Sequence, residues 1–133
     1  MKNKAAQIKA QKKEDEERKN KRVTGAKYEE LAAGYLLKQG FVILERNYTA
    51  APGEIDIIAK DGEYLVFCEV KYRSSKESGG AEFALPASKR MRIGRVAKAY
   101  MVQKHVRRDQ LCRFDCVLID GKEINHIKNA WQL

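Results

Sequence analysis

The stretch GEIDIIAKDGEYLVFCEVK, residues 53–71, decides the fold that the sequence predicts. Two apolar runs flank Asp61-Gly62, which is a strong signal for a two-residue turn in a β-hairpin. Both faces of this hairpin carry large apolar side chains, a pattern typical of a central strand pair that is covered by other layers on each side. Each run also contains acidic residues at positions that face such a layer. The chemistry of these acids is the main question that the sequence raises.

The predicted pairing gathers the acids on one face of the hairpin. Counting outward from the turn places Glu54 opposite Glu69, with Asp56 on the same face. Opposed and diagonal side chains lie about 5 to 7 Å apart, so the three carboxylates form a cluster of like charge. Lys71 shares this face but supplies only one positive charge. Because partly buried carboxylates must be protonated, paired or metal-bound, we expect a hard divalent cation, Mg²⁺ or Mn²⁺, at this cluster.

A helix before the hairpin carries another acid at the border of its apolar face. In TGAKYEELAAGYLLKQG, residues 24–40, apolar side chains recur at helical spacing. Thr24 is the expected N-cap and Gly40 the expected stop. Glu29 falls on the flank of the apolar face, whereas Glu30 points to solvent. Glu29 is therefore an acid that borders the predicted core.

The remaining elements complete an α/β pattern. Residues 41–48 predict a strand that the segment 50–52 ends, and a second helix begins after Pro86. The Ser- and Gly-rich segment 73–86 predicts a mobile loop, for which a contact with substrate and a role as filler are about equally plausible. Two more strands joined by a turn at Asp120-Gly121 end the chain. This order of elements predicts an α/β layer architecture around a mixed sheet.

Length and charge predict one domain with a charged extension. A chain of 133 residues suits a single domain. Residues 1–22 are expected to form a solvated helix or no fixed structure, and residues 23–133 form the folded domain. The net charge is +9, of which the extension supplies +5 from nine basic and four acidic residues. Such a surplus favours polyanion partners, although solubility alone explains it nearly as well.

Several classes of protein are disfavoured. No apolar run approaches the ~18 residues of a membrane helix, and no secretory signal is recognisable, so we expect a cytoplasmic protein without a membrane partner. The three cysteines predict reduced thiols. Neither His105 nor His126 has a plausible nucleophilic Ser or Cys partner, and no Gly-rich phosphate loop occurs. Arg113 and Asp115 predict a structural salt bridge, and the count from the second turn places His126 opposite Asp115.

A set of short motifs in the right order resembles the YraN-like uncharacterised bacterial family, over about residues 24–131. The motifs are Gly25-x-x-x-Glu29-x-x-Ala32, Arg46-Asn47, Gly53-Glu54-Ile55-Asp56, Phe67-x-Glu69-Val70-Lys71-x-Arg73, Lys89, Arg113-Phe114-Asp115 and Asn129-Ala130. That family in turn resembles restriction-endonuclease-like nucleases of the PD-(D/E)XK type, notably archaeal Holliday junction resolvases. Asp56 matches the first acid of that motif, although Ile55 stands in place of its proline.

This resemblance implies a fold and an activity. The implied fold is a restriction-endonuclease-like αβββαβ core with a mixed central β-sheet flanked by helices, which makes residues 23–133 a nuclease-like domain. The implied activity is Mg²⁺- or Mn²⁺-dependent hydrolysis of nucleic-acid phosphodiesters, with DNA, including branched or repair intermediates, as the expected substrate. A homodimer is a candidate assembly, since resolvases act as dimers.

The resemblance also implies roles for individual residues. The expected catalytic residues are Asp56, Glu69, Lys71 and Glu29, and the expected metal ligands are Asp56, Glu69 and Glu54. Residues expected to contact the nucleic-acid backbone are Arg73, Lys89 and Arg90. Two other functions stay open: a non-catalytic nucleic-acid-binding protein that retains the nuclease fold, and an interaction protein whose acids meet the basic surface of a partner.

Overall fold

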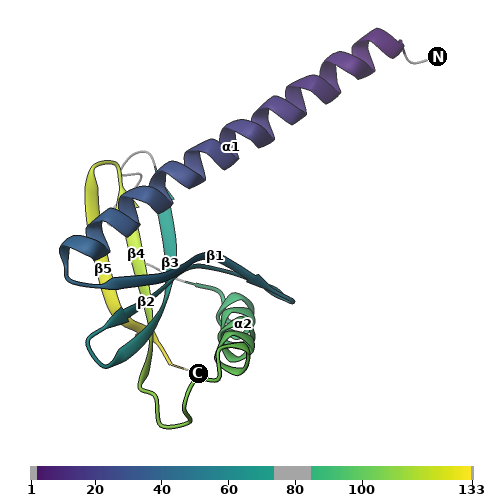
Figure 1. The fold of residues 1–133 in the computed structure, drawn as a ribbon. Coiled ribbons are helices and arrows are strands. Elements are labelled where there is room, and N and C mark those ends of the chain that lie inside the picture. Colours follow the sequence, from purple (N-terminus) through teal and green to yellow (C-terminus); the bar gives the residue numbers. More distant parts are fainter. Residues whose placement is uncertain (1–2, 74–84, 133) are drawn as a thin grey trace.

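In the computed structural model, which describes residues 3–73 and 85–132, a five-stranded sheet lies between two helices (Figure 1). The elements are α1 (Lys4–Lys38), β1 (Val42–Ala50), β2 (Gly53–Asp61), β3 (Tyr64–Arg73), α2 (Ala87–Gln103), β4 (Cys112–Asp120) and β5 (Glu123–Trp131). The strands follow the order β1-β2-β3-β4-β5, and only β3 and β4 are parallel. The predicted α/β class with a mixed sheet flanked by helices is confirmed. Most of the predicted loop at residues 73–86 lies outside the described residues.

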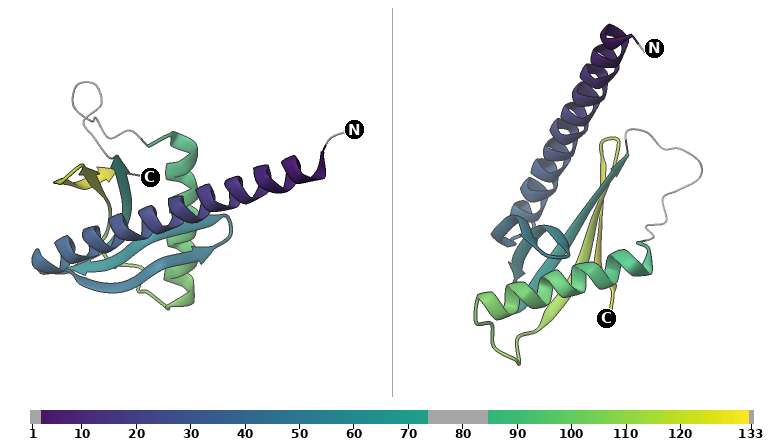
Figure 2. Two further views of the ribbon diagram at one scale, coloured as in Figure 1. Left: turned by 90° about the horizontal axis from the view of Figure 1, so that it is seen from above. Right: turned by 90° about the vertical axis from the view of Figure 1, so that its right-hand side faces the viewer.

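Both faces of the sheet are covered by apolar packing. On one face α1 contributes Ala32 and Leu36, which are fully buried. On the other face α2 contributes Ile93 and Val96, and Figure 2 shows the two helices on opposite sides of the sheet. Burial of this surface stabilises the layers by about 25 cal/mol for each Å² of apolar area. The hairpin of β2 and β3 is therefore central, as its two apolar faces predict.

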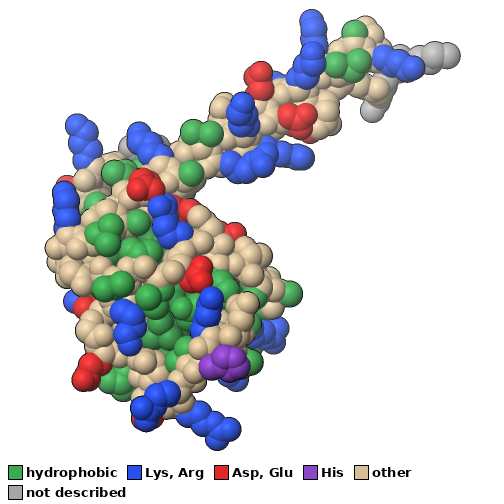
Figure 3. Space-filling model, in the orientation of Figure 1, with side chains coloured by type: hydrophobic (Ala, Val, Ile, Leu, Met, Phe, Trp, Pro, Cys, Tyr) green, Lys and Arg blue, Asp and Glu red, His purple; other side chains and the backbone are tan. Residues whose placement is uncertain are grey.

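The helix α1 begins much earlier than the apolar pattern predicts. Thr24 is not the N-cap, because its hydroxyl donates to the carbonyl oxygen of Asn20 inside the helix at 2.8 Å. The N-cap is Asn3, and the predicted boundary between residues 22 and 23 falls within α1. Residues 4–22 are mostly good helix formers and include no Gly or Pro. The helix therefore continues through this segment although its residues are all exposed and do not pack on the sheet. Figure 3 shows this charged segment extending away from the body.

Long as it is, α1 is strongly charged. Within residues 3–73 and 85–132, no helix combines the length and the apolarity that crossing a membrane requires.

The predicted end of α1 is confirmed. Gly40 follows the C-cap with φ +89°, a conformation that glycine adopts without a steric penalty.

The hairpin register differs from the prediction by two residues. The turn is Gly62-Glu63 instead of Asp61-Gly62, so Ile58 pairs with Phe67 and not with Leu65. Gly62 has φ +57°, and a type II′ turn places a glycine at this first central position. A shift of two residues leaves every side chain on its original face. The error in register by itself therefore moves no acid to the other face of the sheet.

Candidate functional site

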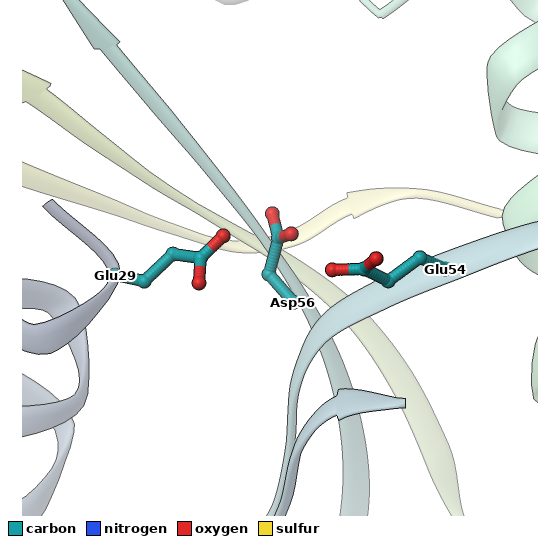
Figure 4. A group of neighbouring side chains, drawn as sticks. All are labelled: Glu29, Glu54 and Asp56. Carbon is teal, nitrogen blue, oxygen red and sulfur yellow. The ribbon is translucent and has the colours of Figure 1, made fainter. Parts of the chain in front are cut away.

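Three carboxylates meet where α1 lies near the start of β2. We call Glu29, Glu54 and Asp56 the carboxylate cluster, because one oxygen of each lies within 4.8 Å of the others. Figure 4 shows Asp56 between Glu29 from α1 and Glu54 from the start of β2. Asp56 and Glu29 are partly buried, whereas Glu54 is exposed. The structure thus brings together acids from two elements that are 25 to 27 positions apart in the sequence.

The strand β2 separates from β3 at Asp56. The regular pairing of the two strands ends at Ile57 and Cys68. Beyond this point the Val70 N–H donates to Asp56 Oδ2 at 2.8 Å. Ile55 and Ile57 pack into different core clusters, one on each side of the sheet, so the side chains of β2 do not alternate regularly between these two positions. The local turn of β2 directs the Asp56 side chain into the space between the two strands and α1.

Contacts on both sides of Glu29 position its carboxylate. Tyr28 of α1 stacks on Tyr72 of β3, with ring centroids 4.2 Å apart. Glu30 forms an ion pair with Arg46 of β1, with an N···O distance of 2.6 Å. Glu30 is exposed, as predicted, and makes its contact at the surface. Glu29 lies between these two contacts in the sequence, so α1 is attached to β1 and β3 next to the cluster.

Asn47 of β1 connects two members of the cluster. With its amide nitrogen oriented toward the acids, it donates to Glu54 Oε1 at 2.9 Å and to Glu29 Oε2 at 2.8 Å. Its φ of +52° is one that few residues other than Gly, Asn and Asp adopt. Asn47 belongs to the motif Arg46-Asn47 but was not among the predicted site residues. The available signal was an Asn inside a predicted strand, three residues after the apolar run 41–44, because Asn is unfavourable in strands.

Glu69 lies beside the carboxylate cluster. Only 7% of the residue is exposed, and its Oε1 is 2.7 Å from Lys89 Nζ. Its negative charge still raises the pKa of both Asp56 and Glu29. The structure therefore places Glu69 close enough to act on the cluster electrostatically, while Lys89, predicted to contact nucleic acid, is paired with Glu69.

The pKa values express the crowding of negative charge. Burial, followed by the charge of Glu69, raises the pKa of Asp56 to about 8, although the hydrogen bond from Val70 opposes this shift. Burial also raises the pKa of Glu29, and its hydrogen bond with Asn47 opposes that shift. Asp56 thus retains a proton near neutral pH when no cation is bound. A set of oxygen donors with excess negative charge fits a hard divalent ion such as Mg²⁺ or Mn²⁺.

The other predicted basic residues, Lys71, Arg73 and Arg90, have different surroundings in the structure. Lys71 is exposed on β3, two residues beyond Glu69 and hence on the same face. Arg73 forms an ion pair with Asp120 at 2.8 Å, at the end of β4. Arg90 lies in the first turn of α2 and lines a hollow together with Gly94 and Gln132. The structure brings Lys71 to the face of Glu69 but engages Arg73 in a contact within the fold.

The start of α2 carries a row of basic side chains. No acidic residue occurs between positions 87 and 108. The basic residues of the first three turns are Lys89, Arg90, Arg92, Arg95 and Lys98. The side chain of Arg92 packs over Gly53, where an added Cβ would approach its Cδ to 2.9 Å. Arg92 is exposed, yet its aliphatic stem contacts the first residue of β2, a contact that the sequence did not predict.

A second group of charged side chains is structural. Asp115 is fully buried and accepts hydrogen bonds from Arg113 Nε at 2.7 Å and from the Asn129 N–H at 3.0 Å. His126 Nε2 is 2.8 Å from its other oxygen. Burial raises the pKa of Asp115, but the bonds with His126 and Arg113 outweigh it and lower the pKa to about 2. The predicted salt bridge is confirmed, whereas the predicted register is wrong, because Val117 lies opposite His126.

Comparisons with known proteins identify similar sequences. A model of the uncharacterised protein family UPF0102 matches residues 28–119. A UPF0102 protein of Lachnoclostridium phytofermentans is 46% identical over 112 residues, which cover 84% of this chain and 95% of the relative. Another, of Dechloromonas aromatica, is 45% identical and covers 80% of this chain and 87% of its own. A third, of Thermodesulfovibrio yellowstonii, is 40% identical, with 80% and 94% covered.

Proposed function

The chain belongs to the UPF0102 family, the YraN-like family that its motifs resemble, and we propose that it is a metal-dependent endonuclease that hydrolyses nucleic-acid phosphodiesters. The observation that carries this proposal is the convergence of Glu29, Glu54 and Asp56 within 4.8 Å. Buried Glu69 adds a fourth carboxyl group next to them. DNA is the expected substrate, and branched or repair intermediates are the structures to test first.

Residues of the cluster and its surroundings have separate roles in this proposal. Glu29, Glu54 and Asp56 would bind the ion, with Glu69 as the adjacent acid. When bound, Mg²⁺ or Mn²⁺ would supply a Lewis acid for the scissile phosphate and lower the pKa of a bound water. Asn47 keeps two of the carboxylates together by donating to both of them. Lys71 would offset negative charge that develops on the phosphate.

Basic side chains next to the cluster support a polyanionic substrate. Arg92 packs over Gly53, so its guanidinium lies beside the start of β2. Lys89 and Arg90 precede it in the first turn of α2, in a segment without acids. Side chains of this type fix the register of a nucleic acid through phosphate contacts and carry no sequence information. Cleavage directed by the shape of the substrate is therefore expected over cleavage at a defined base sequence.

One observation favours a second function, a nucleic-acid-binding protein that performs no cleavage. Glu69 is already neutralised by Lys89 at 2.7 Å, and Asp56 has a pKa of about 8. Because Glu69 is paired and Asp56 is protonated, the folded protein can accommodate these acids without a bound metal ion. This arrangement would persist in a protein that had kept the fold and lost the activity.

The test is a cleavage panel of linear, nicked, flapped and four-way-junction DNA with Mg²⁺ or Mn²⁺. Wild type is compared with Asp56→Asn, Glu69→Gln and Glu29→Gln. Glu30→Gln is the matched control, since Glu30 neighbours Glu29 but pairs with Arg46 at the surface. We expect nicking that the three site variants lose and the control keeps. Calorimetric titration with Mn²⁺ is run in parallel.

The outcomes separate the two functions. Metal-dependent nicking that requires Asp56 and Glu69 supports the endonuclease. Binding of DNA by wild type without nicking of any substrate supports the non-catalytic function. Nicking that survives both Asp56→Asn and Glu69→Gln would exclude the carboxylate cluster as the site of reaction.

A further inference from the structure

The first part of α1 extends beyond the body of the protein as a separate arm. We call residues 4–22 the N-terminal arm. All of its residues are exposed, and the first residue of α1 that is partly buried is Gly25, next to Tyr72. The family match begins only at residue 28, after the arm. Because the arm continues the helix that carries Glu29, its direction relative to the carboxylate cluster is set by the helix itself.

The composition of the arm argues against a helix partner. Ile8 is its only large apolar side chain. A coiled coil requires apolar residues at two positions of every heptad, and the arm has no such repeat. Its surface is charged on all sides, which is typical of helices that remain in solvent or bind a charged partner. Association with a second copy through this helix is therefore disfavoured.

The charges of the arm fall into blocks along the sequence. The first block contains four lysines and no acid, at Lys4, Lys9, Lys12 and Lys13. Four acids follow at positions 14–17, and the second block contains Arg18, Lys19, Lys21 and Arg22. Three of the acids precede a basic residue by four positions, the spacing and orientation that stabilise a helix best. The acids thus support the second block, whereas the first block remains a concentrated positive charge far from the body.

The arm extends on the side of the molecule where the turn between β1 and β2 also points, as Figures 1 and 2 show. This turn leads directly into Gly53 and Glu54 of the carboxylate cluster. A duplex that is bound near Glu54 and continues past this turn would extend toward the same side of the molecule as the arm. The 19 residues of the arm span roughly 28 Å at 1.5 Å per residue, or about eight base pairs of duplex.

We propose that the N-terminal arm binds the phosphate backbone of a nucleic-acid duplex beyond the carboxylate cluster and so lengthens the binding surface. The inference rests on the proposed function for its partner, nucleic acid, but not for cleavage. Lysines on an exposed helix contact phosphates as point charges and release counterions, which makes the binding dependent on salt. The arm then raises affinity for duplex of any sequence and leaves the reaction at the cluster unchanged.

The experiment compares two variants of equal net charge. The arm variant carries Lys9→Gln, Lys12→Gln and Lys13→Gln, and the control variant carries Lys38→Gln, Lys104→Gln and Lys128→Gln, three exposed lysines outside the arm and the cluster. Gln retains helix propensity, and circular dichroism checks that the helix is intact. Binding of a fluorescent duplex DNA longer than about 20 base pairs is measured by anisotropy in EDTA at several salt concentrations, since a shorter duplex cannot reach both surfaces.

The arm variant is expected to lower the salt slope by about 2 to 3, because each lost phosphate contact removes about 0.9. Between 50 and 200 mM salt, wild-type affinity then falls about 16- to 64-fold more than that of the arm variant, with little change in the control. If both variants lower the salt slope equally, or if the arm variant leaves it unchanged, the inference is overturned. Cleavage by wild type would still leave the proposed function intact in that case. Failure of wild type to bind DNA at all would overturn both.

Discussion

Replacement of Asp56 by Asn removes the most strongly shifted acid of the cluster and keeps the shape of the side chain. Burial and the charge of Glu69 raise the pKa of Asp56 to about 8 from an ordinary value of 3.8. Between these values the folded protein binds a proton at Asp56 that the unfolded chain has released. Stability must therefore fall as the pH rises from about 4 to about 8, because the unfolded state is favoured by proton release. The Asp56→Asn variant lacks this proton and escapes the loss.

The magnitude follows from the size of the shift. One pKa unit corresponds to about 1.4 kcal/mol, so two pH units inside this window would lower wild-type stability by up to ~2.7 kcal/mol relative to the variant. Asp56 is partly solvated, and its titration depends on that of Glu69. Both factors reduce the loss of stability. We expect a relative loss of about 1 to 2 kcal/mol between about pH 5 and pH 7.

The assay is urea unfolding without divalent ions, followed by the fluorescence of Trp131, which is buried in the core on the α2 side. Wild type, Asp56→Asn and the Glu30→Gln control are measured at several pH values. The difference between wild type and Asp56→Asn should widen as the pH rises, while wild type and the control should remain parallel. Parallel curves for wild type and Asp56→Asn would refute the assignment of a raised pKa to this carboxyl group.

Three further substitutions test the surroundings of the site. Lys89→Met should tighten Mn²⁺ binding in calorimetry, because it removes an ammonium that competes with the metal ion for Glu69. Unchanged or weaker binding would show that Lys89 does not compete with the ion. Asn47→Gly keeps a backbone that tolerates φ +52° but removes the amide, so metal affinity should fall about 10- to 100-fold with little loss of helix content. Asp115→Asn should lower the free energy of unfolding by about 3 to 5 kcal/mol, since it leaves Arg113 without its buried carboxylate; a loss below ~1 kcal/mol would contradict that role.

Local patterns in the sequence predict the elements of the fold and the face on which each acid lies. The alternation of side chains along a strand depends only on neighbouring residues, so Asp56, Glu69 and Lys71 could be grouped before any tertiary contact was known. The turn dipeptide was misplaced by one residue, which shifts the pairing by two and by itself moves none of these side chains to the other face. Apolar periodicity likewise placed Glu29 at the edge of the helix face that packs on the sheet.

Tertiary structure decided which of these acids meet and which are neutralised. The separation of β2 from β3 beyond Ile57, the orientation of Asn47 and the contact of Lys89 with Glu69 each depend on residues that are distant in the sequence. The apolar pattern also did not predict the full length of α1, because a solvated helix of good helix formers needs no apolar face. Strand alternation specifies a side of the sheet, whereas distances of a few ångströms between carboxylates depend on twist and on packing between layers.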